Sequence, residues 1–193
     1  MESVLSQGRR RRPLVVIGKD TRLSADMLES ALSAGLCSVG CDVICVGVVP
    51  TPAVAFLVQR FKADAGIMIS ASHNPYPYNG IKIFSGEGFK LPDDLENRIE
   101  DLVLDSPEEI ALMKAEELGT MSYRKSAVAD YVEHLKSTVP TTLEGLRLAV
   151  DCANGSASAT AAMLFGDLGA EVVLLANEPD GLNINENCGS THM

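Results

Sequence analysis

The residues best suited to chemistry gather around one serine. Ser72 and His73 follow directly on a short apolar run, and Lys82 comes ten positions after the serine. A serine hydroxyl can attack an electrophile or carry a phosphate ester, and a neighbouring histidine can donate a hydrogen bond to a phosphate. A lysine can neutralise charge or move a proton. Because phosphoryl transfer depends on positioning and charge neutralisation, this combination favours a serine that handles phosphate.

Two other interpretations of the same segment stay open. Asn74-Pro75 commonly starts a turn, so the segment can be a plain structural turn, which is the simpler explanation from composition and spacing alone. A serine hydrolase that uses Ser72 and His73 is less favoured, because the G-x-S-x-G motif is absent and no third residue is evident to orient the histidine. Adjacent residues on an extended loop are also expected to point in different directions.

The serine segment lies at the end of a predicted buried strand. Strands and helices alternate with short connections, which predicts an α/β fold with a mainly parallel, mixed sheet covered by helices on both faces. Ligands of such sheets bind at the carboxyl ends of the strands, where loops 19–22 and 70–75 are both expected. The predicted strands are at about 14–17, 43–48, 65–69, 81–84, 146–150 and 171–175, and the predicted helices at about 24–39, 51–61, 92–104, 107–117, 124–138 and 156–168.

Local signals mark where several elements begin and end. Ser24 is a predicted N-cap, Gly40 is well placed to end the first helix, and Pro52 suits the first turn of the second. A capping-box pattern at 106–109 predicts another helix start, and 79–80 is an Asn-Gly turn before the fourth strand. The apolar positions of the first helix, expected to face the sheet, are Met27, Leu28, Ala31, Leu32, Gly35 and Leu36.

The order of strand, polar loop and helix restarts in the last third of the chain. Residues 169–172 match residues 40–43 at the same point of the unit. This predicts two related units, 1–143 and 144–193, with a boundary within 141–144. Two strands and one helix cannot bury both faces of a sheet, so we expect the second unit to be incomplete and the chain to be a fragment of a longer protein.

Composition argues against several classes of protein. The formal net charge is −10, and residues 87–117 hold eleven acidic and three basic side chains, which repels nucleic acid. The five cysteines form no CxxC pair, so buried reduced thiols are favoured over a zinc site. No apolar run approaches the roughly 20 residues that cross a membrane, and no signal peptide is evident. We therefore expect a cytoplasmic protein with neither a nucleic-acid nor a membrane partner.

Several segments resemble the phosphohexose mutase superfamily and follow in its expected order. They are Val16-Ile-Gly-Lys-Asp-Thr-Arg-Leu-Ser24, Val49-Pro-Thr-Pro-Ala53, Ile69-Ser-Ala-Ser-His-Asn-Pro75 and Asn79-Gly-Ile-Lys82. Segments 88–91, 181–185 and 188–192 are similar to the phosphoglucosamine mutase branch. The resemblance covers nearly the whole chain from about residue 15 onward and implies a phosphoglucomutase-like domain I. The superfamily's Gly-rich opening segment, which carries an arginine, has no match in residues 1–12.

The resemblance implies catalytic roles for three residues. Ser72 would be the phosphoserine that interconverts glucosamine 6-phosphate and glucosamine 1-phosphate through a 1,6-bisphosphate, in the synthesis of amino-sugar nucleotides and cell-wall precursors. Lys82 would serve in acid–base chemistry, and His73 would contact the reacting groups. A Mg²⁺ ion would bind the phosphate on Ser72, with aspartate ligands that lie beyond the end of this chain.

Further residues would surround the phosphoserine without reacting. The resemblance implies that three residues lie near the phosphate: Lys19, Arg22 and Asn74. For Lys19 and Arg22, an ion pair that holds the loop is an equal structural alternative. Sugar choice would depend on further domains of the same enzyme. We expect the chain alone to be inactive, because the metal ligands and the domains that orient the substrate would both be missing. A homodimer stays open.

Two other functions remain as alternatives. A phosphomannomutase or phosphoglucomutase would use the same serine chemistry on another sugar. A non-catalytic domain that binds a phosphosugar or a partner subunit would carry no transferable phosphate at Ser72.

Overall fold

The apolar runs of the sequence form the middle of a five-stranded sheet. The computed structural model describes residues 11–192. Its first unit contains β1 (Leu14–Lys19), α2 (Ser24–Ser38), β2 (Asp42–Val48), α3 (Thr51–Arg60), β3 (Ala65–Ile69), β4 (Ile81–Ser85), α4 (Asp93–Leu104), β5 (Met121–Tyr123) and α5 (Ala127–Thr138). The strand order is β4-β3-β1-β2-β5, with only β4 antiparallel to its neighbour among these strands. The predicted α/β fold with a mainly parallel, mixed sheet is confirmed.

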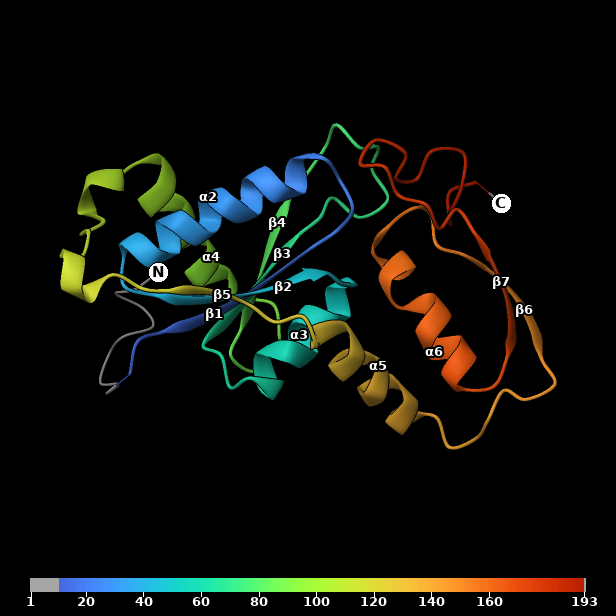
Figure 1. The fold of residues 1–193 in the computed structure, drawn as a ribbon. Helices are drawn as coiled ribbons and strands as arrows, with labels where there is room; N and C mark the ends of the chain where they lie inside the picture. The colour runs from blue at the N-terminus through green and yellow to red at the C-terminus, as the bar shows by residue number, and fades with distance from the viewer. Residues whose placement is uncertain (1–10, 193) are drawn as a thin grey trace.

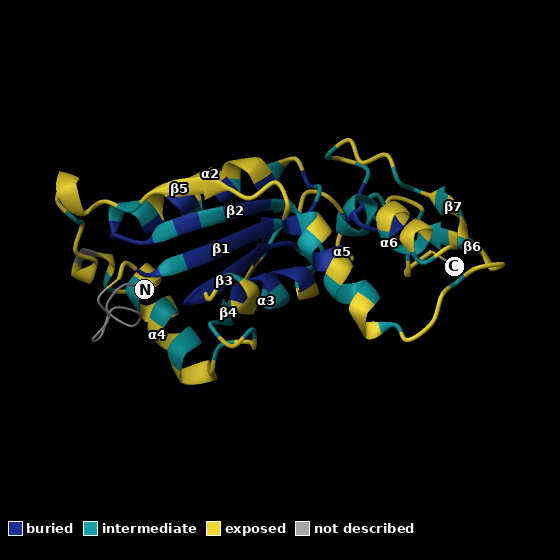
Figure 2. Cartoon of the chain, turned by 60° about the horizontal axis from the view of Figure 1, so that its bottom comes forward, coloured by how far each residue is buried: buried dark blue, intermediate teal, exposed yellow. Residues whose placement is uncertain are grey.

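Alternate residues of the central strands face two different helical layers. In β1, Val15 and Ile17 pack in the cluster under α2, whereas Val16 packs in the cluster under α3 and α5. Figure 1 shows α2 on one side of the sheet and α3 and α5 on the other. Because successive side chains of a strand point to opposite faces, a strand covered on both sides must be apolar throughout. Figure 2 accordingly shows the middle of the sheet as the most buried part of the chain.

The start of α2 differs from the prediction. Ser24 is the first residue of the helix and not its N-cap, and the preceding Leu23 has helical dihedral angles. The Ser24 hydroxyl accepts a hydrogen bond from Asn79 Nδ2 at 2.9 Å. The serine therefore ties the helix to the loop before β4 instead of capping its own helix.

The face that α2 turns toward the sheet agrees with the predicted one only in part: Leu36 is buried and Leu28 and Leu32 pack against the core. Met27 is 65% exposed, while Glu29 and Ser33 are buried. Glu29 pairs with Lys19 at the end of β1, and Ser33 Oγ lies 3.6 Å from Cys45 Sγ. Polar contacts beneath the helix thus help to set its buried face, which the spacing of apolar residues alone does not predict.

The helix predicted at 107–117 is wrong. Two short 3-10 turns, Pro107–Glu109 and Ala115–Glu117, take its place, and the serine of the predicted capping box makes no side-chain cap hydrogen bond. Between the turns, Met113 N donates to Ser38 O at 2.9 Å. This bond ties the segment to the end of α2 and uses a donor that a helix would need for its own ladder.

Strand β5 has no counterpart among the predicted strands. Its three residues are all exposed and show no alternation, so its place depends on parallel pairing with residues 43–45 of β2. The helix predicted at 156–168 is divided, because a 3-10 turn over Ser156–Ala159 precedes α6 (Ala161–Asp167). Short exposed strands and interrupted helices carry the weakest periodic signal.

A second, two-stranded sheet follows the first unit. Strand β6 (Arg147–Asp151) pairs in parallel with β7 (Glu171–Leu175), and α6 packs against β7. The chain changes sheets between the end of α5 and the start of β6, as Figure 1 shows at its right side. The predicted domain boundary within 141–144 stays a prediction. No helix among residues 11–192 is long and apolar enough to cross a membrane.

Candidate functional site

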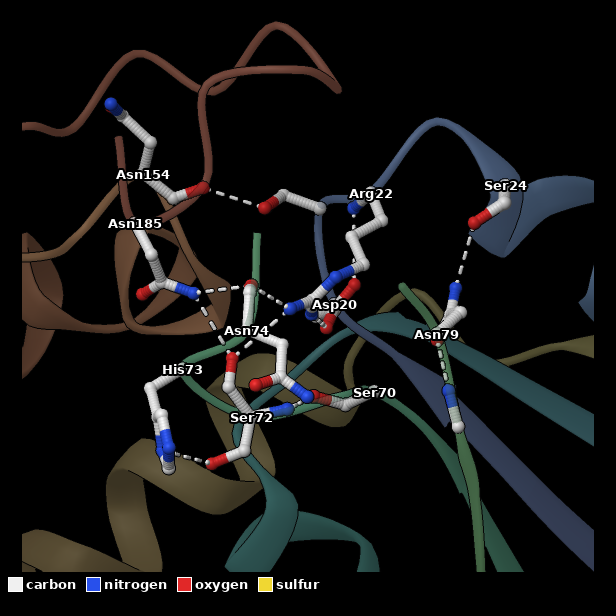
Figure 3. A network of polar contacts seen from close by, with 12 residues as sticks. Asp20, Arg22, Ser24, Ser70, Ser72, His73, Asn74, Asn79, Asn154 and Asn185 are labelled. Atoms are coloured by element: carbon white, nitrogen blue, oxygen red, sulfur yellow. Dashed lines mark hydrogen bonds and ion pairs between the residues drawn. The ribbon is translucent and has the colours of Figure 1, made fainter. Parts of the chain in front are cut away.

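The loops after β1 and β3 meet at the carboxyl edge of the first sheet. Lys19 is the partner of Ile69 in the parallel pairing of the two strands, so both chains leave the sheet side by side. Asp20 N extends this pairing by donating to Ile69 O at 3.0 Å. Figure 3 shows the polar contacts that radiate from these two loops. The sequence prediction that loops 19–22 and 70–75 share one edge agrees with this arrangement.

Ser72 has a left-handed backbone with φ of 57°. Such a conformation costs a residue other than glycine about 1–2 kcal/mol, so surrounding contacts must hold it. Ser72 N donates to Ser70 Oγ at 3.1 Å, and Asn74 N donates to Ala71 O at 3.2 Å, which closes a tight turn. The turn leaves Ser72 exposed at its tip. Its hydroxyl is therefore open to a ligand from solution.

His73 lies closer to the serine hydroxyl than the sequence argument expects. Ser72 Oγ and His73 Nδ1 are 3.4 Å apart, because the left-handed turn brings neighbouring side chains to one side. The expectation that the two side chains point apart is wrong. The distance is at the long end for a hydrogen bond, and within the described part of the chain no further hydrogen bond orients the His73 ring.

Arg22 holds the turn from beneath. Its side chain is fully buried and paired with Asp20, which is itself 2% exposed in its side chain. The Nη2 group donates to Ser72 O at 3.2 Å and to Asn74 O at 2.5 Å. The guanidinium thus binds the backbone of the serine loop with its fork of donors. This is the structural alternative that the sequence left open for Arg22, although the residue is also next to Ser72.

Lys19 is directed toward α2. Its Nζ lies 2.7 Å from Asp26 Oδ1 and 2.5 Å from Glu29 Oε2. Burial works to lower the pKa of Lys19, but hydrogen bonds and charge from the two carboxylates outweigh it and raise the pKa. The ammonium is held in an ion pair at the base of the loop, which again favours the structural alternative.

Lys82 reaches the serine loop from β4. It is paired with Met68 across the antiparallel strands, and its Nζ donates to Ser70 O at 3.2 Å. Ser70 N donates to Gly80 O at 2.8 Å, and a Cβ on Gly80 would lie 3.1 Å from Ser70 O. The close backbone approach at Gly80 therefore brings the start of β4, and the Lys82 ammonium, beside the turn.

The second unit contributes contacts that the sequence argument missed. Asn185 Nδ2 donates to Ser72 O and to Asn74 O, both at 3.1 Å. Thr21 Oγ1 donates to Asn154 O at 2.6 Å. Residues 181–185 enter the sequence argument only as part of a resemblance. Their Asn and Gly content indicates a loop after the last strand, but nothing local indicates which distant carbonyls it binds.

The site contains no complete set of metal ligands. Among residues 11–192, no group of three or more His, Cys, Asp or Glu side chains is arranged to hold a metal ion. The arrangement instead offers an exposed hydroxyl, an adjacent imidazole and a nearby ammonium. These groups can accept, bind and release a phosphoryl group.

Comparison with known proteins places this geometry in a family context. The sequence model for phosphoglucomutase/phosphomannomutase alpha/beta/alpha domain I matches residues 1–109. The phosphoglucosamine mutase of Clostridium novyi is 53% identical over 189 residues, and that of Acetivibrio thermocellus is 51% identical over 190. Each alignment covers 98% of this chain but 42% of the relative, so the chain spans less than half the length of these curated relatives.

A solved structure shows the same fold. The phosphoglucomutase/phosphomannomutase family protein of Burkholderia thailandensis superposes with a TM-score of 0.75 at 30% sequence identity. The superposition covers 93% of this chain and 38% of that protein. Both units of the present chain therefore have counterparts in a longer relative.

Proposed function

The chain belongs to the phosphoglucomutase/phosphomannomutase family, and from this premise we propose that it carries the phosphoserine of a phosphoglucosamine mutase. The names of its curated relatives support the sugar, glucosamine phosphate. The reaction would interconvert glucosamine 6-phosphate and glucosamine 1-phosphate, as a step toward amino-sugar nucleotides and cell-wall precursors. We expect it to take place in the cytoplasm.

One observation carries the proposal: Ser72 stands exposed at the tip of a left-handed turn whose backbone is held from beneath. The hydroxyl points away from the buried donors, as Figure 3 shows, so an ester there would face solvent and substrate. His73 Nδ1 lies within reach of the same oxygen. A held nucleophile with free access suits a group that must both receive and give up a phosphate.

We assign the chemical steps as follows. The sugar hydroxyl attacks the phosphorus of the Ser72 ester, a new oxygen–phosphorus bond forms, and the bond to Ser72 Oγ breaks. One proton leaves the sugar hydroxyl and one is gained by Ser72 Oγ, and we assign this transfer to Lys82. His73 would donate a hydrogen bond to the phosphoryl oxygens. The resulting bisphosphate reorients in the site, and its other phosphate returns to Ser72 by the reverse steps.

The Mg²⁺ ion that the family resemblance implies does not find its ligands in the described residues. No cluster of three or more ligating side chains occurs within 11–192. The side chains near Ser72 are instead a histidine and a lysine, and neither supplies the carboxylate oxygen that Mg²⁺ prefers. The residues described do not form the metal site by themselves, and we derive no step through a metal.

The carrier role of Ser72 can be tested by intact-mass measurement. The protein is incubated with glucosamine 1,6-bisphosphate, and we expect a gain of about 80 Da, the mass of one phosphoryl group. The gain should disappear in Ser72→Ala and persist in Ser30→Ala, which removes an exposed hydroxyl on α2. A phosphoryl adduct that is retained in Ser72→Ala would contradict the proposal.

A phosphomannomutase or phosphoglucomutase remains the nearest rival. The family match and the Burkholderia structure both include these activities in their descriptions. Either enzyme would use the same serine, so the adduct on Ser72 does not separate them. Turnover of glucosamine, mannose and glucose phosphates by the whole enzyme does: we expect the highest kcat/KM with glucosamine phosphate.

A further inference from the structure

Two side chains from different units bind the same two carbonyl groups of the serine loop. Ser72 O and Asn74 O each accept a hydrogen bond from Arg22 Nη2 and another from Asn185 Nδ2. Figure 3 shows both donors converging on these oxygens, while the Ser72 hydroxyl points the opposite way. The orientation of two peptide groups that follow the serine side chain, 72–73 and 74–75, is therefore set from both units at once.

Asn185 is itself held in place by its own loop. Its backbone N donates to Ala153 O at 2.9 Å, and its φ is 60°, a left-handed value that asparagine tolerates better than most residues. Two neighbouring hydrogen bonds also join the units: Thr21 Oγ1 donates to Asn154 O, and Leu23 N donates to Gly181 O at 2.9 Å. We call this contact between the loop after β1 and the second unit the seam. The Asn185 amide is thus aimed at the serine loop by a fixed backbone.

The contact suits an amide and no other group of similar size. Both acceptors are carbonyl oxygens, so the side chain opposite them must donate, and a carboxylate would place negative charge against them. The pair of Arg22 and Asp20 is formally neutral, and so is Asn185. These residues therefore orient the loop without adding net charge beneath the phosphate.

We propose that Asn185 is a positioning residue for the phosphoserine, through which the second unit holds the Ser72 turn in its left-handed conformation. The proposal rests on the proposed function for the identity of the reaction, but its structural part does not. It predicts that loss of the Asn185 amide loosens residues 70–80 and lowers the rate of phosphoryl transfer. Binding of the sugar phosphate should change little, because Asn185 touches only the backbone of the loop.

The test compares Asn185→Asp and Asn185→Gly with Asn187→Asp in the whole protein. Asn187 is an ideal control, because it is exposed, has a left-handed φ of 50°, and makes no side-chain hydrogen bond among the described residues. Glycine keeps the left-handed backbone of position 185 while removing the amide. We expect amide hydrogen exchange in residues 70–80 to speed up about tenfold in both Asn185 variants and to stay unchanged in Asn187→Asp.

Kinetics provide the second measurement. We expect kcat to fall about tenfold or more in the Asn185 variants, with KM for the sugar phosphate within about twofold of the unsubstituted enzyme. Thr21→Val separates positioning from general loosening of the seam, since it removes the bond to Asn154 without touching the serine loop. It should leave exchange in residues 70–80 within about twofold.

Two results would overturn the proposal. Exchange and kcat that match Asn187→Asp in both Asn185 variants would show that the amide does not hold the loop. Equal effects of Thr21→Val and Asn185→Gly would show that only the seam as a whole matters. If the unsubstituted enzyme turns over no hexose phosphate, the proposed function fails, whereas the exchange comparison still decides whether Asn185 holds the turn.

Discussion

Removal of the Arg22 side chain should destabilise the protein strongly. The guanidinium is fully buried, binds Asp20, and donates to two carbonyls of the serine loop. Arg22→Ala leaves the carboxylate of Asp20, which is 2% exposed in the unsubstituted protein, without its cation. Breaking a buried ion pair by removing one partner costs about 3–5 kcal/mol, because an uncompensated charge is left behind.

The size of the effect can be measured by thermal unfolding. For a chain of 150–250 residues, each kcal/mol lowers Tm by about 2–4 °C, so Arg22→Ala should melt about 6–20 °C below the unsubstituted protein. Far-UV circular dichroism reports the transition, and urea unfolding reports the free energy. The matched control is Arg147→Ala, because the Arg147–Glu171 pair spans 3.4 Å between two exposed side chains.

A double substitution tests the cause of the loss. If the unpaired carboxylate is responsible, Asp20→Ala combined with Arg22→Ala should recover part of the stability lost in Arg22→Ala alone. A Tm of Arg22→Ala within about 2 °C of that of Arg147→Ala would show that the buried charge does not cause the loss.

Three further predictions follow from particular contacts. Because the pKa of Lys19 is raised in the folded state, its ion pairs stabilise the fold fully below the ordinary value of 10.5 and lose this contribution as the pH rises through the folded-state pKa. Urea unfolding between about pH 8 and pH 11 should show the fall in the free energy of unfolding, and the fall should be smaller in Lys19→Met. Gly66→Ala should destabilise by about 1–3 kcal/mol in urea unfolding, because the new Cβ would lie 2.4 Å from Val58 Cγ2, whereas Gly35→Ala in α2 meets nothing within 4 Å and should stabilise by up to about 1 kcal/mol. In a coupled assay, the 193-residue chain by itself should convert glucosamine 6-phosphate at less than about a tenth of the rate of a full-length relative, since it spans 42% of such relatives and positioning alone can contribute about 7–11 kcal/mol.

The position of the serine loop in the fold could be predicted from the sequence. Ala65–Ile69 is an uninterrupted apolar run, it forms the strand at the predicted bounds, and the serine segment follows at its carboxyl end. The register of β1 and β3 then brings the two polar loops together, as parallel pairing predicts. The roles of the individual site residues stay predictions until they are measured.

Other features needed contacts that no local pattern encodes. The segment after α4 is not a helix because its donors bind the end of α2, and β5 exists because β2 offers an open edge. The hydrophobic spacing of α2 identifies part of its buried face but misses Glu29, which is buried and meets the Lys19 ammonium. In each case a partner outside the element outweighs the local preference.

The α/β class, most of the strands and the loop that carries Ser72 follow from the sequence by itself, because alternation, apolar runs and turn residues are properties of consecutive positions. Only the tertiary structure decides how that loop is held. The Ser72 and Asn74 carbonyls meet a donor that lies more than 100 residues away, Asn185, in addition to the nearer Arg22. Contacts of such range depend on where two units dock, and docking is governed by surfaces that form after each unit has folded.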